Sequence, residues 1–168
     1  PRTSAMNILG LSSDFHDSSA ALLCGGRIRF SAAEERFSLQ KHDSSFPSLA
    51  IDAALASAGL RGSEIDGVAY HEDPVEKFSR VLTSRLRDYP RGFPAFARSL
   101  RELMLGQLWV KLDICKKLGI SPGKIRCVPH HHSHAAYAFA TSPFESALVL
   151  VLDAVGEWRS EEHTSELQ

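Results

Sequence analysis

The chain has 168 residues, with 19 basic and 20 acidic side chains and a formal net charge of −1. That length is enough for one domain with a proper core, and the balanced charge gives no electrostatic reason to expect a nucleic-acid or membrane partner. No apolar run approaches the roughly 20 residues of a membrane span and no signal-peptide pattern appears, so we expect a cytoplasmic protein. The three cysteines are widely spaced and form no CxxC pair, which disfavours a disulfide framework or a thiolate zinc site.

The pattern of apolar residues predicts strands and helices in a mixed order. Runs at 7–11, 20–24 and 27–33 predict three consecutive strands, the last two joined by a hairpin turn at Gly25-Gly26. The further predicted elements are a helix from Pro47 to Gly59, a strand at 65–70, two or three helices within 75–118, a strand at 125–128, a helix at 131–140 and a strand at 147–152. The last of the helices within 75–118 is predicted at about 95–118 and ends at Gly119. This order predicts a layered α/β domain whose mixed sheet has an antiparallel start.

Both ends of the chain differ from the part between them. Residues 1–5 precede Met6, directly before the first predicted strand, and we expect this leader to lie outside the fold. The tail 159–168 is abruptly polar, has no strand pattern and looks like the translation of a sequencing adapter. We therefore expect an incomplete domain at 6–158, a non-native tail, and no partner after Trp158 for the strand at 147–152, which should be buried in a complete fold.

Two polar clusters lie near the amino end. The loop at 12–19 is rich in hydroxyls and main-chain donors, a composition that holds phosphate groups in sheet-based nucleotide folds but also forms turns without any ligand. Residues 34–46 carry charges of both signs beside aromatic residues, which is typical of a solvated loop. Pro47 suits the first turn of the following helix, with Ser45 as a possible cap.

A histidine-rich segment at 129–136 points to a metal site. On a helix starting at Pro129, His130 and His134 share one face, and the apolar run 147–152 delivers Asp153 at its carboxyl end. Two imidazoles and one carboxylate suit Fe(II), Zn or Mn at a catalytic site better than a closed structural zinc. The alternative is a partly exposed helix start that happens to be rich in histidine.

Four segments in the same order resemble the amino-terminal domain of the O-carbamoyltransferases of nodulation-factor and antibiotic biosynthesis. They are DFHDSSAA at 14–21, EERF at 34–37 with KHD at 41–43, HHHSHAA at 130–136, and VLDAVGEW at 151–158. The resemblance implies the first part of an actin-like, ribonuclease H-like domain. It also implies transfer of a carbamoyl group, made from carbamoyl phosphate and ATP as carbamoyl-adenylate, to a hydroxyl of a sugar or other small-molecule acceptor.

The resemblance also implies roles for individual residues. His16 and Lys41 match positions of the transfer site, where cations and donors surround an adenylate phosphate and a developing oxyanion. The expected metal ion is Fe²⁺, held by His130, His134 and Asp153. The remaining residues expected to bind substrate are Asp14, Asp17, Ser18, Ser19 and Arg36.

This sequence departs from the family pattern at Leu39-Gln40, where basic residues are common, and at His132, which should point away from the metal-binding face. The family's partner for this domain is a carboxyl-terminal YrdC-like domain of the same chain, which makes the adenylate and is not in this sequence. Two other functions stay open: a tRNA threonylcarbamoyl-type transferase, which the neutral charge disfavours, and a non-catalytic metal-binding domain of the same fold.

Overall fold

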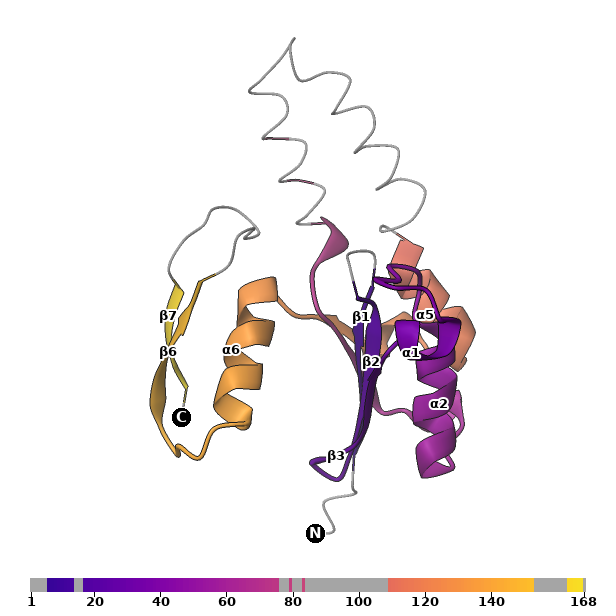
Figure 1. The fold of residues 1–168 in the computed structure, drawn as a ribbon, viewed down its shortest axis with the longest axis horizontal. Helices are drawn as coiled ribbons and strands as arrows, with labels where there is room; N and C mark the ends of the chain where they lie inside the picture. The colour runs from indigo at the N-terminus through magenta and orange to yellow at the C-terminus, as the bar shows by residue number, and fades with distance from the viewer. Residues whose placement is uncertain are drawn as a thin grey trace. The chain divides into compact units, whose positions relative to one another are not determined.

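The computed structural model describes residues 6–13, 17–75, 79, 83 and 109–152, together with the backbone of 163–167. It divides into two compact units (Figure 1). Unit 1 comprises residues 1–70 and 101–127, and unit 2 comprises residues 71–100 and 128–168. Each unit is described by itself.

Unit 1 is built on a five-stranded mixed sheet in the order β3-β2-β1-β4-β5. Its strands are β1 (Asn7–Ser12), β2 (Ser19–Cys24), β3 (Arg27–Ala33), β4 (Gly67–Tyr70) and β5 (Ile125–Cys127). The first three strands form an antiparallel meander, whereas β4 runs parallel to β1 and β5 runs parallel to β4. The predicted α/β class with an antiparallel start is confirmed, and the sheet is the one expected for the first part of a ribonuclease H-like domain.

Helices lie beside one face of this sheet (Figure 1). They are α1 (Glu35–Ser38), α2 (Ser48–Ala58) and α5 (Val110–Leu118), with 3₁₀ turns η1 (Gly62–Glu64) and η3 (Pro122–Lys124). The helix predicted at about 95–118 is confirmed in its last part, and the other helices predicted within 75–118 fall largely outside the described residues.

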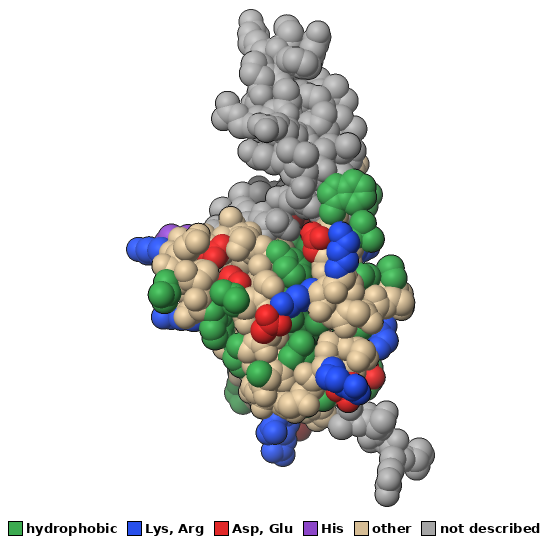
Figure 2. All heavy atoms as spheres, turned by 90° about the vertical axis from the view of Figure 1, so that its right-hand side faces the viewer, with side chains coloured by type: hydrophobic (Ala, Val, Ile, Leu, Met, Phe, Trp, Pro, Cys, Tyr) green, Lys and Arg blue, Asp and Glu red, His purple; other side chains and the backbone are tan. Residues whose placement is uncertain are grey.

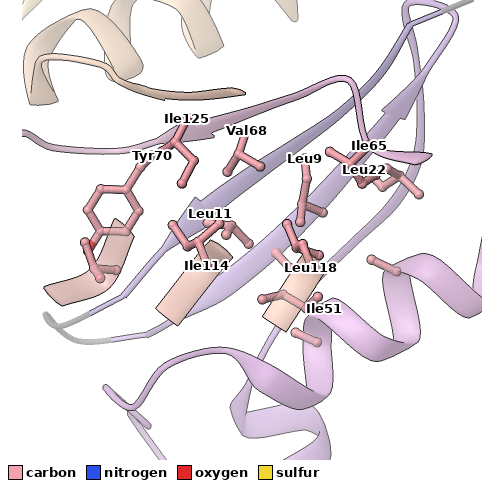
Figure 3. Packing of buried hydrophobic residues seen from close by; sticks show 14 residues of the cluster. Leu9, Leu11, Leu22, Ile51, Ile65, Val68, Tyr70, Ile114, Leu118 and Ile125 are labelled. Carbon is pink, nitrogen blue, oxygen red and sulfur yellow. The ribbon is translucent and has the colours of Figure 1, made fainter. Parts of the chain in front are cut away.

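The core of unit 1 follows from period-two burial in the strands and period-3.6 burial in the helices. Leu9 and Leu11 of β1 are buried with Leu22 of β2, and they pack against Ile51 of α2 and Ile114 of α5 (Figure 3). Burial of each such side chain is worth about 1.5–3 kcal/mol, so this one cluster is the main source of stability in unit 1.

Glycines produce the turns where the sequence predicted them. Gly25 and Gly26 have φ values of 59° and 77°, which closes the tight hairpin between β2 and β3. Gly59 and Gly119 end α2 and α5 in the left-handed conformation, with φ values of 64° and 67°.

Unit 2 contains α6 (His130–Ala140) and a hairpin of β6 (Ala147–Val151) with β7 (His163–Leu167). The expectation that nothing after Trp158 pairs with β6 is wrong, because β7 pairs with it in antiparallel register from Ala147↔Leu167 to Val151↔His163. One face of β6 is uncovered. Leu148 and Leu150 are 68% and 57% exposed while Val151 is buried, because α6 packs beside β6 on one side only (Figure 1). That this strand is buried in a complete fold stays a prediction.

On the face drawn in Figure 2, basic and acidic side chains are interspersed and neither sign forms a large continuous field. Within the described part of the chain, no helix is long and apolar enough to cross a membrane.

Candidate active site

The loop between β1 and β2 is anchored at both ends by buried serines. The Ser13 hydroxyl lies 3.1 Å from the Tyr70 hydroxyl, and the Ser18 N–H donates to the Asp43 main-chain oxygen at 2.9 Å. Two of the predicted site residues, Asp14 and His16, lie in this loop outside the described residues. The anchors fix where the loop leaves and rejoins the sheet.

The second polar cluster is not a solvated loop at its start. Glu34 is 3% exposed, and its carboxylate accepts the N–H groups of Leu49 at 2.9 Å and Ala50 at 2.7 Å. These are donors at the start of α2, which an α-helix leaves without internal partners. The predicted cap at Ser45 is therefore wrong: a carboxylate 15 residues before Leu49 caps this helix.

Asp43 is the second buried carboxylate of this region. Hydrogen bonds from the Ser38 hydroxyl, the Ser45 hydroxyl and the Ser45 N–H hold the pKa of the Asp43 carboxyl below its ordinary value of 3.8. Since its main-chain oxygen also accepts the Ser18 N–H, Asp43 ties the 39–45 segment to the loop after β1.

Three polar side chains meet where these two segments touch. His42 Nδ1 lies 3.0 Å from Asp17 Oδ1, and the main-chain N–H of His42 donates to Glu35 Oε2 at 3.0 Å. One ligand atom from each of these three residues lies within 4.8 Å of the others. The side chains of His42 and Asp17 are 63% and 46% exposed, so the group is open to a substrate.

The other predicted substrate residues are close to this group along the chain. Lys41 is exposed and directly precedes His42, and Arg36 is exposed on α1. Ser19 begins β2, and Ser18 is fully buried with its Oγ lacking a hydrogen-bond partner among the described residues. Burial favours an anchoring role for Ser18, while the roles of Lys41, Arg36 and Ser19 remain predictions.

The two predicted metal-binding histidines face each other in unit 2. Their Nε2 atoms are 3.1 Å apart on one face of α6, as the four-residue spacing predicts. Two nitrogens that each lie about 2.0–2.1 Å from one metal ion are separated by roughly 3.0–3.4 Å, so the pair fits a shared ion. His132 is exposed and takes no part in this contact, which agrees with the predicted helix register.

A hollow of about 320 Å³ lies between His134 of this pair and the end of β6. It is lined by His134 together with the following six residues: Tyr137, Ala138, Val149, Leu150, Val151 and Leu152. Asp153, the third predicted ligand, lies outside the described residues but directly follows Leu152. The donor set and the hollow are compatible with a divalent metal ion.

Sequence reasoning missed Glu34, His42 and the role of Glu35. Glu34 and His42 were noted only as members of a polar cluster. The buried contacts of Glu34 involve residues 15 and 16 positions away, and the His42 contact spans 25 positions. No local spacing rule links residues that far apart, although a charged residue at the end of a strand offers a weak signal.

Comparison with known proteins places this geometry in a family. A family model described as "Carbamoyltransferase N-terminus" matches residues 7–168. An uncharacterized protein of Synechocystis, sll1178, is 40% identical over 159 residues, which is 90% of this chain and 26% of that protein. The nodulation protein NolNO of Sinorhizobium fredii is 33% identical over 158 residues, which is 92% of this chain and 22% of that protein. The chain thus spans about a quarter of the length of these relatives.

A solved structure, YeaZ from Pseudomonas aeruginosa, matches with a TM-score of 0.47 and 15% identity, covering 96% of this chain and 66% of that one. At that score the fold assignment rests on the sheet itself and on the family match.

Proposed function

Since this chain belongs to the carbamoyltransferase family, matched over residues 7–168, we propose that it forms part of the transfer site of an O-carbamoyltransferase. The reaction moves a carbamoyl group from carbamoyl-adenylate, made from carbamoyl phosphate and ATP, to a hydroxyl of a sugar or other secondary metabolite. The family match is the observation that carries this proposal. The contact between the two polar segments supports it, because Asp17 pairs with His42 and the exposed Lys41 directly precedes His42.

Lys41 is the cation that we propose for the adenylate phosphate. It is exposed, and the two residues that follow it are held by main-chain hydrogen bonds, His42 to the Glu35 carboxylate and Asp43 to the Ser18 N–H. A charge-assisted hydrogen bond to a phosphate oxygen is worth about 1.5–3 kcal/mol, and the same charge stabilises the phosphate as it leaves. Losing it should lower transfer at least about tenfold.

His130 and His134, with Asp153, are the residues that would hold the divalent metal ion, which we propose to be Fe²⁺. When bound, such an ion supplies a Lewis acid for a phosphate or carbonyl oxygen. The protein's own contribution is to keep both imidazoles on one helix face with their Nε2 atoms 3.1 Å apart. A protein that binds the metal ion but forms no hydroxyurea in the tests below would instead be a metal-binding domain without catalytic activity. The tRNA-modifying alternative draws no support from the interspersed charges of Figure 2.

The test uses the full-length polypeptide that the gene encodes, with carbamoyl phosphate, ATP and hydroxylamine as a small acceptor. We expect formation of hydroxyurea and AMP by the wild-type protein and at least about a tenfold loss in Lys41→Ala. Lys116→Ala, at an exposed lysine of α5, is the matched control and should keep the wild-type rate. No hydroxyurea from the wild-type protein would overturn the proposed transferase.

The metal assignment has a separate readout. Elemental analysis should find about one iron per chain in the wild-type protein, and neither His130→Ala nor His134→Ala should retain it. His132→Ala should retain it, because that side chain is exposed and lies outside the pair. Unchanged metal content in both single variants would remove these residues from the site.

A further inference from the structure

We infer that Asp17 and His42 form a proton-accepting dyad, in which His42 removes the proton from the acceptor hydroxyl and Asp17 orients the imidazole. This inference rests on the proposed function and adds a base to it. It differs from the prediction drawn from the sequence, which placed the catalytic roles at His16 and Lys41 and assigned none to His42.

The Asp17 contact determines which nitrogen of His42 can accept a proton. An ionised carboxylate is only an acceptor, so the 3.0 Å contact to Asp17 Oδ1 requires the hydrogen to reside on Nδ1 of a neutral imidazole. The lone pair then belongs to Nε2, on the opposite side of the ring. Since the side chain is 63% exposed, Nε2 is accessible to a substrate hydroxyl.

The main chain around the dyad is held in place from several directions. Glu35 Oε2 accepts the His42 N–H, and the next residue, Asp43, accepts the Ser18 N–H through its main-chain oxygen. Ser18 in turn directly follows Asp17. Each residue of the dyad is therefore next to a residue whose main chain is fixed by a hydrogen bond. A chance ion pair at the surface would not require its neighbours to be fixed in this way.

Asp17 and His42 also share an unusual backbone conformation, with φ values of 59° and 56°. Asp and His tolerate the left-handed region better than most residues, but it still costs free energy relative to the α or β region. The surrounding hydrogen bonds compensate for this cost, and the result is that the two side chains point toward each other across 25 residues of sequence.

The dyad completes the proton balance of the transfer. As the acceptor oxygen bonds to the carbamoyl carbon, its proton passes to His42 Nε2, and the bond from that carbon to the adenylate phosphate oxygen breaks with its electron pair leaving on AMP. The imidazolium that forms carries its positive charge next to Asp17, which stabilises it. The proton is then released to solvent through the exposed face of the ring.

The same two residues, with Glu35, also have the spacing of a cation site. A cation bound through Nδ1 requires that atom to carry a lone pair, whereas the dyad requires it to carry a hydrogen. Long-range ¹⁵N–¹H NMR of the histidine-labelled protein separates the two: we expect the His42 Nδ1–H tautomer, and a His42 signal with the hydrogen on Nε2 would overturn the dyad.

The kinetic test compares two acceptors in the full-length protein. Water must lose a proton as it attacks, whereas hydroxylamine attacks with its nitrogen lone pair and needs no base at that step. General bases contribute roughly 10²–10⁴-fold, so His42→Asn should slow AMP release to water about 100-fold while slowing hydroxyurea formation less than about threefold. Asp17→Asn should show the same selectivity for the acceptor, since an amide does not stabilise the imidazolium. Asn is chosen at both positions because it tolerates the left-handed backbone.

Two variants serve as matched controls: His132→Asn at an exposed histidine, and Asp52→Asn at an exposed carboxylate that pairs with Lys117 at 2.7 Å. Neither should change the ratio of the two rates. Suppose that the wild-type protein forms hydroxyurea, and that His42→Asn either slows both reactions by the same factor or slows neither. The dyad is then refuted, while the proposed transferase function stands. If the wild-type protein forms none, the proposed function fails and the dyad fails with it.

Discussion

Glu34→Ala should destabilise unit 1 more than any other single substitution of a charged residue that we propose. The Glu34 carboxylate is buried and accepts two main-chain N–H groups of α2, from Leu49 and Ala50. A buried donor left without its partner costs about 1–3 kcal/mol, and two donors are affected, which gives about 2–6 kcal/mol. We expect a loss of about 3 kcal/mol in the free energy of unfolding, because water will reach part of the exposed helix start.

Glu34→Gln shows how much of this loss in the free energy of unfolding comes from each of the two hydrogen bonds. The glutamine amide has one acceptor oxygen, and its NH₂ group faces the second donor, so about half of the loss should remain. Urea denaturation followed by circular dichroism measures both values, and amide hydrogen exchange of 48–58 reports whether the start of α2 opens. Asp113→Ala, at an exposed carboxylate of α5, should change stability by no more than about 0.5 kcal/mol. A Glu34→Ala protein that loses less than about 1 kcal/mol, with α2 exchanging as in the wild type, would refute the capping argument.

Three further substitutions test other details of unit 1. Gly62→Ala should destabilise by about 1–3 kcal/mol in urea melts, because a Cβ there would lie 2.5 Å from the Leu118 main-chain oxygen, whereas Gly123→Ala meets nothing closer than 4.0 Å and should be silent; equal effects would contradict the packing of η1 on α5. Leu39→Asn should stabilise by about 0.5–1 kcal/mol, since Leu39 is 89% exposed and adopts a φ of 59° that asparagine tolerates better; a lower melting temperature would count against this. The lowered pKa of the Asp43 carboxyl contributes stability that is present above its ordinary value of 3.8 and is lost as the pH falls through the lower folded value. Asp43→Asn should therefore lose less stability than the wild type between about pH 5 and pH 3, and parallel stability curves would exclude this linkage.

The sequence by itself determined the local elements and their ends. Alternation of apolar residues predicted β1 to β3, the Gly25-Gly26 pair predicted their hairpin, and Gly59 and Gly119 predicted where α2 and α5 end. These predictions succeeded because side-chain periodicity and the conformational freedom of glycine act over a few residues. The facing pair on α6 was predictable for the same reason, since four residues make about one helical turn.

Only the tertiary structure decided the contacts between distant segments. Glu34 caps α2 rather than facing solvent because β3 ends beside the start of that helix. Likewise, β7 pairs with β6 although its residues show no strand pattern, because main-chain hydrogen bonds need no particular side chains. His42 meets Asp17 because hydrogen bonds through Ser18, Glu35 and Asp43 bring two loops together. A side chain's role in such a contact depends on which donors and acceptors the fold brings to it, and the order of residues along the chain does not specify that arrangement locally.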